Sequence, residues 1–173
     1  MKIDVTAIIG DHIRTLYDAR TEKRSLVDIV TFFAIPLIAS IISFLMKFGV
    51  SSEFYNVSIT FFGIFIALLL NIQVAIFAIF QRKWDAPKDK KLADIALGKI
   101  EKRNTILREL NANISYLVLF CCATLFISVL FYVLKWDAWV APAFIVLMYS
   151  HFFLTLIMVV KRSHALFQME YNA

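Results

Sequence analysis

The chain has 173 residues, 61% of them hydrophobic and 17 of them Phe, and its mean hydropathy is +0.76. A water-soluble domain of this size could not cover so many apolar side chains, so the composition excludes that class and predicts a protein embedded in lipid. The formal net charge is +5, and the basic residues are grouped outside the apolar stretches.

Residues 1–25 contain a short amphipathic pattern. Apolar residues recur there at three- and four-residue spacing, with charged residues between them, which predicts a cytosolic helix of about four turns. They are Val5, Ile8, Ile9, Ile13, Leu16 and Tyr17. Helices that lie on a lipid surface usually have a polar face dominated by Lys and Arg. Because this face carries Asp11 as well as Arg14, packing against protein is favoured over packing on the membrane.

Four apolar stretches follow, and each is long enough to cross a membrane. A helix needs about 20 residues to span a hydrocarbon core of roughly 30 Å. The stretches contain almost no charge and cover residues 26–46, 54–80, 110–134 and 138–160. We therefore predict an all-α polytopic membrane protein, with four transmembrane helices within residues 26–173. Pro36 near the middle of the first stretch predicts a kink.

The positions of Lys and Arg predict the orientation. Five precede the first stretch, nine lie between the second and the third, and two follow the fourth, so sixteen of the eighteen lie on one side of a four-span protein. Basic residues in short loops resist translocation across the membrane. Both termini are therefore predicted to lie in the cytoplasm, with connections of only a few residues on the other side.

The second stretch places small and polar residues on one helix face. They follow one another at spacings of three or four and comprise Thr60, Gly63, Ala67, Asn71 and Ala75. In lipid, such a face lets helices approach closely, and Asn71 can form a hydrogen bond across the contact. The face can serve packing within one chain, an interface between subunits, or the lining of a water-filled path, and the sequence leaves these three roles open.

The fourth stretch contains His151 and Thr155 at membrane depth. Ionisable groups there are costly and raise a functional hypothesis. His151 can be a neutral residue that is hydrogen-bonded to a neighbouring helix, or it can face a pore or a gate. Both interpretations stay open.

Segment 81–111 joins the second and third stretches. Its helical periodicity runs without a breaker into the third stretch, which predicts that the third membrane helix continues about 20 residues, or roughly 30 Å, into the cytosol. The segment starts with a basic cluster that consists of Arg82, Lys83, Trp84, Lys88, Lys90 and Lys91. This cluster can anchor the protein at anionic lipid headgroups. Alternatively, it can form the rim of a site for a partner, a nucleotide or an oligonucleotide in the cytosol.

The sequence lacks the residue groups on which membrane enzymes depend. Its three histidines lie far apart, and no Cys-x-x-Cys, phosphate-binding glycine loop or zinc motif occurs. The adjacent Cys121 and Cys122 suit neither an ordinary disulfide nor a metal site. We therefore expect neither an enzyme nor a protein with a metal or a cofactor.

Three functional hypotheses remain. The first is an oligomeric ion channel or pore-forming effector gated from the cytoplasm, which requires several copies because four helices of one short chain can hardly enclose a wet path. The second is a non-conducting membrane anchor or sensor that recruits a soluble effector. The third, an immunity-type protein that blocks a pore-forming toxin, is disfavoured by the small outer connections.

In size, four-span topology and cytosolic helical extension, the whole chain resembles the compact membrane components of bacterial anti-phage systems, such as the channel effector of Hailong and the membrane subunit of Kiwa. The resemblance implies a homo-tetramer in the bacterial inner membrane and a role in antiviral defence. For the Hailong type it also implies a channel restrained by a single-stranded DNA oligomer that a partner enzyme makes.

Overall fold

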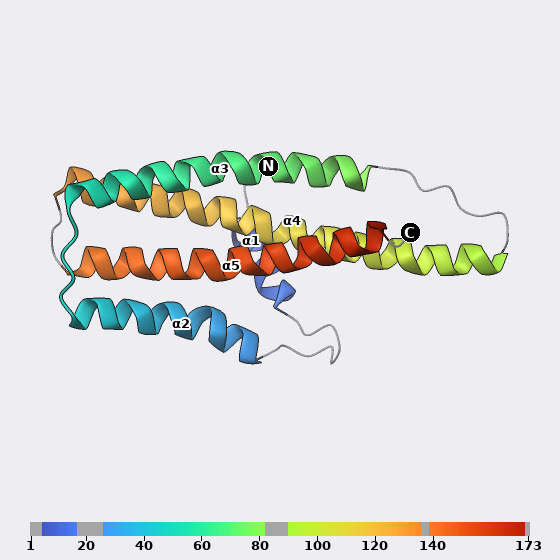
Figure 1. Ribbon diagram of the computed structural model, residues 1–173, viewed down its shortest axis with the longest axis horizontal. Helices are drawn as coiled ribbons and strands as arrows, with labels where there is room; N and C mark the ends of the chain where they lie inside the picture. Colours follow the sequence, from blue (N-terminus) through green and yellow to red (C-terminus); the bar gives the residue numbers. More distant parts are fainter. Residues whose placement is uncertain (1–4, 17–25, 82–89, 136–138, 172–173) are drawn as a thin grey trace.

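The computed structural model describes residues 5–16, 26–81, 90–135 and 139–171, and this part of the chain is almost entirely helical (Figure 1). Its helices are α1 (Val5–Thr15), α2 (Leu26–Leu45), α3 (Ser52–Phe80), α4 (Lys90–Val133) and α5 (Val140–Tyr171). For the described residues, the all-α fold class predicted from the sequence is confirmed.

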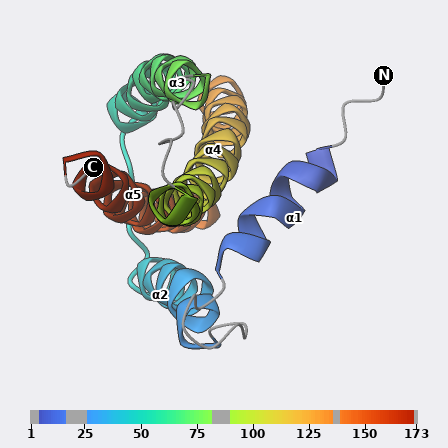
Figure 2. The same cartoon turned by 90° about the vertical axis from the view of Figure 1, so that its right-hand side faces the viewer.

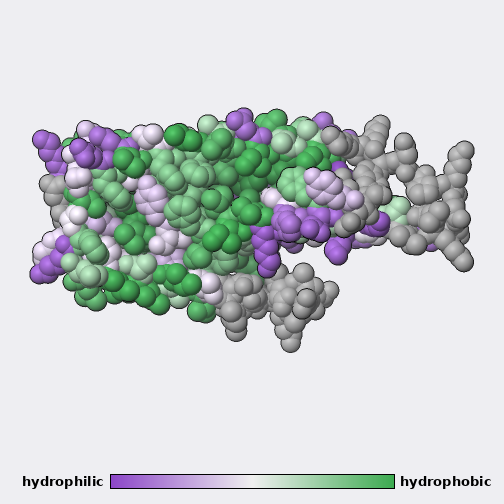
Figure 3. All heavy atoms as spheres, in the orientation of Figure 1, coloured by the Kyte–Doolittle hydropathy of each residue, from purple (hydrophilic) through white to green (hydrophobic). Residues whose placement is uncertain are grey.

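Three of the helices are long and apolar enough to cross a membrane. They are α3, residues Ala96–Val133 of α4, and residues Val140–Met169 of α5. The described side chains of α2 form the apolar run Val30–Leu45, which is shorter than these three, while the whole helix has 20 residues. Hydrophobic side chains dominate the middle of the face in Figure 3, and hydrophilic ones gather at its left end and towards its right.

α4 is the longest helix, with 44 residues. At the usual rise per residue it is about 66 Å long, roughly twice the thickness of a hydrocarbon core. The predicted continuation of the third apolar stretch is therefore present as one unbroken helix. Of the predicted helical segment 81–111, α4 contains the part from Lys90 onward.

Two helical hairpins form the bundle, and both turn at the same end. α2 joins α3, and α4 joins α5, at the left of Figure 1. Just beyond the ends of α2 and α4, Lys47 and Lys135 have φ angles of 52° and 48°. α3, α4 and α5 pack around a shared core, α2 lies on the outer side of α5, and α1 lies against the outer side of α4 (Figure 2).

Aromatic side chains fill the core between α3 and α5. The rings of Phe61, Phe62 and Phe65 on α3 lie 5.6, 5.6 and 4.9 Å from the ring of Phe152 on α5, each in an edge-to-face arrangement. Such pairs contribute about 0.5–1.5 kcal/mol each beyond the burial of their area. Leu117 of α4, also fully buried, closes this core from the third helix.

The side of α1 that packs against α4 contains only part of the predicted apolar pattern. The predicted packing of this helix against protein is confirmed, although the helix has about three turns rather than four. Val5, Ile9 and Ile13 remain between 37% and 40% exposed. His12 and Thr15 are buried instead. Leu16 is also buried and Ile8 is half-buried. The side of α1 that faces the bundle therefore combines these two apolar residues with the polar contacts of His12 and Thr15.

Candidate functional site

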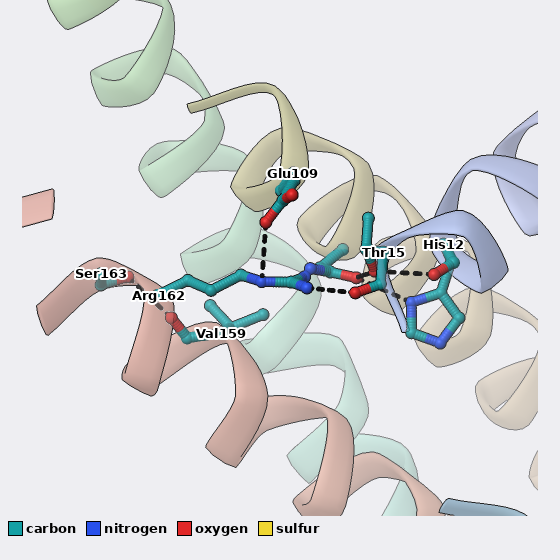
Figure 4. A network of polar contacts seen from close by, with 7 residues as sticks. His12, Thr15, Glu109, Val159, Arg162 and Ser163 are labelled. Carbon is teal, nitrogen blue, oxygen red and sulfur yellow. Dashed lines mark hydrogen bonds and ion pairs between the residues drawn. The ribbon is translucent and has the colours of Figure 1, made fainter. Parts of the chain in front are cut away.

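The end of α1 docks onto the bundle through buried polar side chains (Figure 4). His12 Nδ1 lies 2.8 Å from Oδ1 of Asn113 on α4, and the hydroxyl of Thr15 lies 2.7 Å from the same amide oxygen. That hydroxyl is also 2.6 Å from the carbonyl oxygen of His12. Asn113 is fully buried, so it is the residue of α4 to which this end of α1 is attached.

Arg162 of α5 completes what we call the docking cluster, which consists of His12, Thr15, Glu109, Asn113 and Arg162. Its Nη2 donates a hydrogen bond to the carbonyl oxygen of Thr15, and its Nε lies 3.3 Å from Oε2 of Glu109 on α4. Thr15 is the last residue of α1, where the helix dipole places partial negative charge on the carbonyl groups. The guanidinium therefore stabilises this helix end and joins α1, α4 and α5.

Burial keeps His12 neutral. Its ring stacks on the ring of Tyr116, with centroids 3.8 Å apart and planes within 1° of parallel. Desolvation by burial lowers the pKa of His12 to about 4. The hydrogen bond with Asn113 opposes this shift, and the positive charge of Arg162 adds to it. The docked helix thus excludes a proton that an exposed histidine binds near its ordinary pKa of about 6.5.

Nε2 of His12 and Nδ2 of Asn113 are buried and lack a hydrogen-bond partner among the described residues. An unsatisfied buried polar group costs about 1–3 kcal/mol. The docked position of α1 is therefore less stable than a fully paired contact would be, which suits a helix that docks reversibly.

His151 of α5 pairs with a carbonyl group that a proline has released. Pro36 lies inside α2, and because it has no N–H, the carbonyl of Phe32 four residues earlier loses its helical partner. Nδ1 of His151 lies 3.2 Å from this carbonyl oxygen. A carbonyl only accepts hydrogen bonds, so Nδ1 carries the proton.

Tyr116 connects the two histidines. Its ring stacks on His12, and its hydroxyl lies 2.8 Å from Nε2 of His151. Since Nδ1 of His151 carries the proton, Nε2 of the neutral ring accepts the hydrogen bond from the tyrosine hydroxyl. A continuous path of contacts therefore runs from α1 through α4 and α5 to the position of Pro36 in α2.

The small and polar face that the sequence predicts on the second span lies on the outer surface of α3. Thr60, Ala67, Asn71 and Ala75 are exposed. Gly63 is half-buried. The buried residues of α3 lie on the opposite side of the helix. The α3 face, as we call these five residues, is therefore directed away from the core of the chain.

His151 and Thr155, the polar residues predicted in the fourth stretch as a further candidate for a pore or gate, lie elsewhere. They are 5% and 0% exposed. The hydroxyl of Thr155 donates a hydrogen bond to the carbonyl of His151 on its own helix, at 2.9 Å. The structure thus brings the five residues of α3 together on one surface and places the two residues of α5 inside the chain, and a pore-lining role for either group stays a prediction.

The basic cluster lies mostly outside the described residues. Arg82, Lys83, Trp84 and Lys88 belong to the part left undescribed, and Lys90 and Lys91 are described as the start of α4 without their side chains. Both interpretations of this cluster, lipid anchor and ligand rim, stay predictions.

Sequence reasoning missed the docking cluster, although a signal for it is present. Glu109, Asn113 and Tyr116 follow one another at spacings of four and three, which places them on one face of α4. His12 and Thr15 are three residues apart on α1. Polar residues on one face at the edge of an apolar stretch indicate a buried polar contact, but the spacing does not show which helix supplies the partner.

Within the described ranges, no three His, Cys, Asp or Glu side chains form a group that could hold a metal ion. Comparisons with protein-family models, with curated protein sequences and with solved structures find no match for this chain. The docking cluster and the α3 face are therefore the two features from which a function can be argued.

Proposed function

We propose that this chain forms a homo-oligomer in a membrane, that neighbouring copies meet through the α3 face, and that the assembly conducts ions under the control of α1. The observation that supports the proposal most is the position of Asn71. This residue is exposed, and it lies well inside a helix that is long and apolar enough to cross a membrane.

An exposed amide at this position is costly if lipid surrounds it. Hydrocarbon offers no hydrogen-bond partner, and removing an unpaired amide from water costs about 2–7 kcal/mol. A second copy of the chain or a water-filled path supplies the missing partners. Ala67 and Ala75 on the same face allow helix backbones to approach closely, so the α3 face suits an interface better than a lipid contact.

The proposal of conduction rests on the polar side chains that such an assembly would bring together. In a symmetric ring, the Thr60 hydroxyl and the Asn71 amide of every copy face one shared axis. Rings of uncharged polar groups can replace part of the hydration shell of an ion. A tetramer with four transmembrane helices per copy is the arrangement that we propose.

Control by α1 is supported by the docking cluster. When α1 leaves its position, Tyr116 loses the ring that stacks on it, and the path of contacts to His151 and α2 is interrupted at its first step. We place both termini in the cytoplasm because sixteen of the eighteen basic residues lie on that side. The trigger is then a cytosolic partner or an anionic nucleotide or oligonucleotide that binds segment 81–111. We also propose that the protein acts in antiviral defence at the bacterial inner membrane.

The test is the conductance of the purified full-length protein in planar bilayers, with and without nucleotides and single-stranded DNA oligomers. Asn71→Leu keeps the size of the side chain and removes the amide, so we expect it to reduce the current strongly. Ile72→Leu is the matched control, because Ile72 is 43% exposed on another side of α3, and it should conduct like the wild type. A wild-type protein that never conducts in any of these conditions contradicts the channel.

A non-conducting anchor or sensor is the second candidate, and the exposed apolar stripe of α1 favours it. Val5, Ile9 and Ile13 offer a soluble effector a hydrophobic surface. This function would replace the channel if the wild type does not conduct but retains a cytosolic protein partner that the Ile9→Asp variant loses.

A further inference from the structure

A groove of about 550 Å³ lies between α3 and α4, near the end of α3. Ile76 and Leu107 contribute buried apolar side chains to it. Val74, Phe77 and Phe80 also line it, and they remain 69%, 61% and 45% exposed. The volume lies within the range of ligand clefts, roughly 300–1,000 Å³, and the apolar lining suits a hydrocarbon chain.

One side of the groove is polar and ordered by hydrogen bonds. Gln73 of α3 and Asn111 of α4 line this side. Nε2 of Gln73 donates to Oδ1 of Asn111 at 3.2 Å and to the hydroxyl of Ser115 at 2.8 Å. The two helices are therefore held together at the polar side of the groove.

Arg108 adds a positive charge to the same side. It is exposed, and no Asp or Glu lies three or four positions away on α4, so the helix supplies no counter-ion. The adjacent Glu109 pairs with Arg162, and Asp11 of α1 pairs with Arg14. Within the described part of the chain, the groove thus combines an apolar lining with one cation, Arg108, that has no acidic partner.

The depth of Arg108 matches the expected edge of a membrane. Nη2 of Arg103 donates to the carbonyl oxygen of Ile79 at 2.8 Å, so the end of α3 is level with Arg103. Arg108 lies about 7.5 Å deeper along α4 at the usual helix rise. Beyond Glu109, α4 carries no further charge, so the guanidinium stands where headgroups meet hydrocarbon.

We propose that this groove binds an anionic phospholipid, with Arg108 as the ligand of its phosphate and Leu70 and Val74 as contacts of an acyl chain. A guanidinium binds a phosphate through charge-assisted hydrogen bonds, and anionic lipids give the cytoplasmic leaflet its negative surface potential. The inference requires that α3 and α4 lie in a bilayer. It requires neither conduction nor assembly of several copies.

The test is photo-cross-linking of the full-length protein in phosphatidylcholine vesicles. A trace of phosphatidylglycerol with a photoreactive acyl chain is the probe, and a phosphatidylcholine with the same chain is its reference. In the wild type we expect mass spectrometry to find the label within residues 70–80, with the phosphatidylglycerol probe preferred. Arg108→Gln should lose about fivefold of this preference, which corresponds to about 1 kcal/mol, whereas Arg108→Lys should keep most of it.

Two further variants test whether the lipid preference depends on the groove or on positive charge anywhere on the protein. Lys161→Gln removes an exposed charge from α5 and should leave the preference unchanged. Val74→Trp fills the groove and should lower labelling by both probes. The lipid site is overturned if Arg108→Gln prefers the phosphatidylglycerol probe as strongly as the wild type does. It is also overturned if the label is spread evenly over all apolar helices. Cross-links between two copies at the groove, in place of lipid adducts, also overturn it. None of these outcomes depends on the currents measured for Asn71→Leu.

Discussion

Pro36 and His151 are far apart in the sequence but belong to one structural unit. The proline removes the N–H that would pair with the carbonyl of Phe32, and Nδ1 of His151 lies 3.2 Å from that carbonyl oxygen. The histidine therefore replaces a backbone donor, and the hydroxyl of Tyr116 satisfies its second nitrogen. These two contacts explain why a histidine lies inside an apolar helix, without giving it a catalytic role.

A double-mutant cycle tests this unit. His151→Ala leaves the Phe32 carbonyl without a donor in the presence of Pro36, but not in the Pro36→Ala background, where the new N–H of residue 36 restores the helical bond. We expect a coupling free energy of about 1–3 kcal/mol in thermal unfolding in detergent. Thr105→Ala, which removes an exposed hydroxyl that donates to the carbonyl of Glu101 on its own helix, should be additive with Pro36→Ala. If the effects of His151→Ala and Pro36→Ala were also additive, the pairing of His151 with the Phe32 carbonyl would be refuted.

The docking of α1 should weaken in acid because of His12. Its pKa is about 4 in the docked helix, whereas the undocked helix exposes it with an ordinary pKa of about 6.5. As the pH falls from 6.5 towards 4, only the undocked state takes up the proton, so docking is fully stable above this window and is lost within it. At pH 5 the loss is on the order of 2 kcal/mol.

Hydrogen exchange measures this effect. Protection factors of the amides in α1, corrected for intrinsic exchange, should be roughly thirtyfold lower at pH 5 than at pH 7.5. The His12→Gln variant should show little change between the two pH values. An equal pH dependence in both proteins would show that another group is responsible.

At the residue scale, the sequence indicated single residues but not their partners. It indicated that His151 is exceptional and that Pro36 disturbs its helix, but it did not name Phe32, whose carbonyl the proline frees. It could not show that His151 reaches this carbonyl, because the side chain lies on a different helix. His12 and Asn113 were missed for the same reason.

At the scale of elements, Arg162 is the residue that joins three helices. It contacts the carbonyl at the end of α1 and pairs with Glu109 on α4. Because Thr15 ends α1, the guanidinium interacts with the negative end of the helix dipole as well as with one hydrogen-bond acceptor. Arg162 therefore determines how firmly α1 stays on the bundle.

Arg162→Gln should release α1 without unfolding the bundle. A hydrogen bond from a charged donor contributes about 1.5–3 kcal/mol, so we expect the protection factors of α1 to fall by at least about tenfold. The amides in the apolar parts of α3 and α5 should keep theirs. Lys161→Gln, one residue earlier and exposed, is the control, and α1 should stay protected in it. Equal protection of α1 in the two variants would exclude this role of Arg162.

The elements themselves could largely be predicted. Apolar length located the helices of residues 26–173, and the lack of breakers correctly indicated that α4 is continuous, because helix formation depends mainly on local sequence. The docked side of α1 could not be predicted, because stacking on Tyr116 and the bond to Asn113 depend on tertiary structure. The shorter apolar part of α2, Val30–Leu45, leaves the count of four spans a prediction.

At the scale of the whole molecule, one chain has a complete core and an incomplete outer surface. Aromatic contacts satisfy the inner side of α3, while the α3 face with Asn71 remains exposed. A monomer in lipid would leave this amide without a partner. An assembly that joins α3 faces removes this cost and creates the shared axis that conduction requires.

The most direct test of assembly through the α3 face is cross-linking of single-cysteine variants in native membranes with a short bis-maleimide. Cys121→Ala and Cys122→Ala remove the two native thiols. Ala67→Cys then reports on the α3 face, while Ile72→Cys reports on another side of the same helix, where Ile72 is 43% exposed. We predict covalent dimers with Ala67→Cys and monomers with Ile72→Cys. Monomers alone with Ala67→Cys, or equal cross-linking of both variants, would contradict assembly through this face.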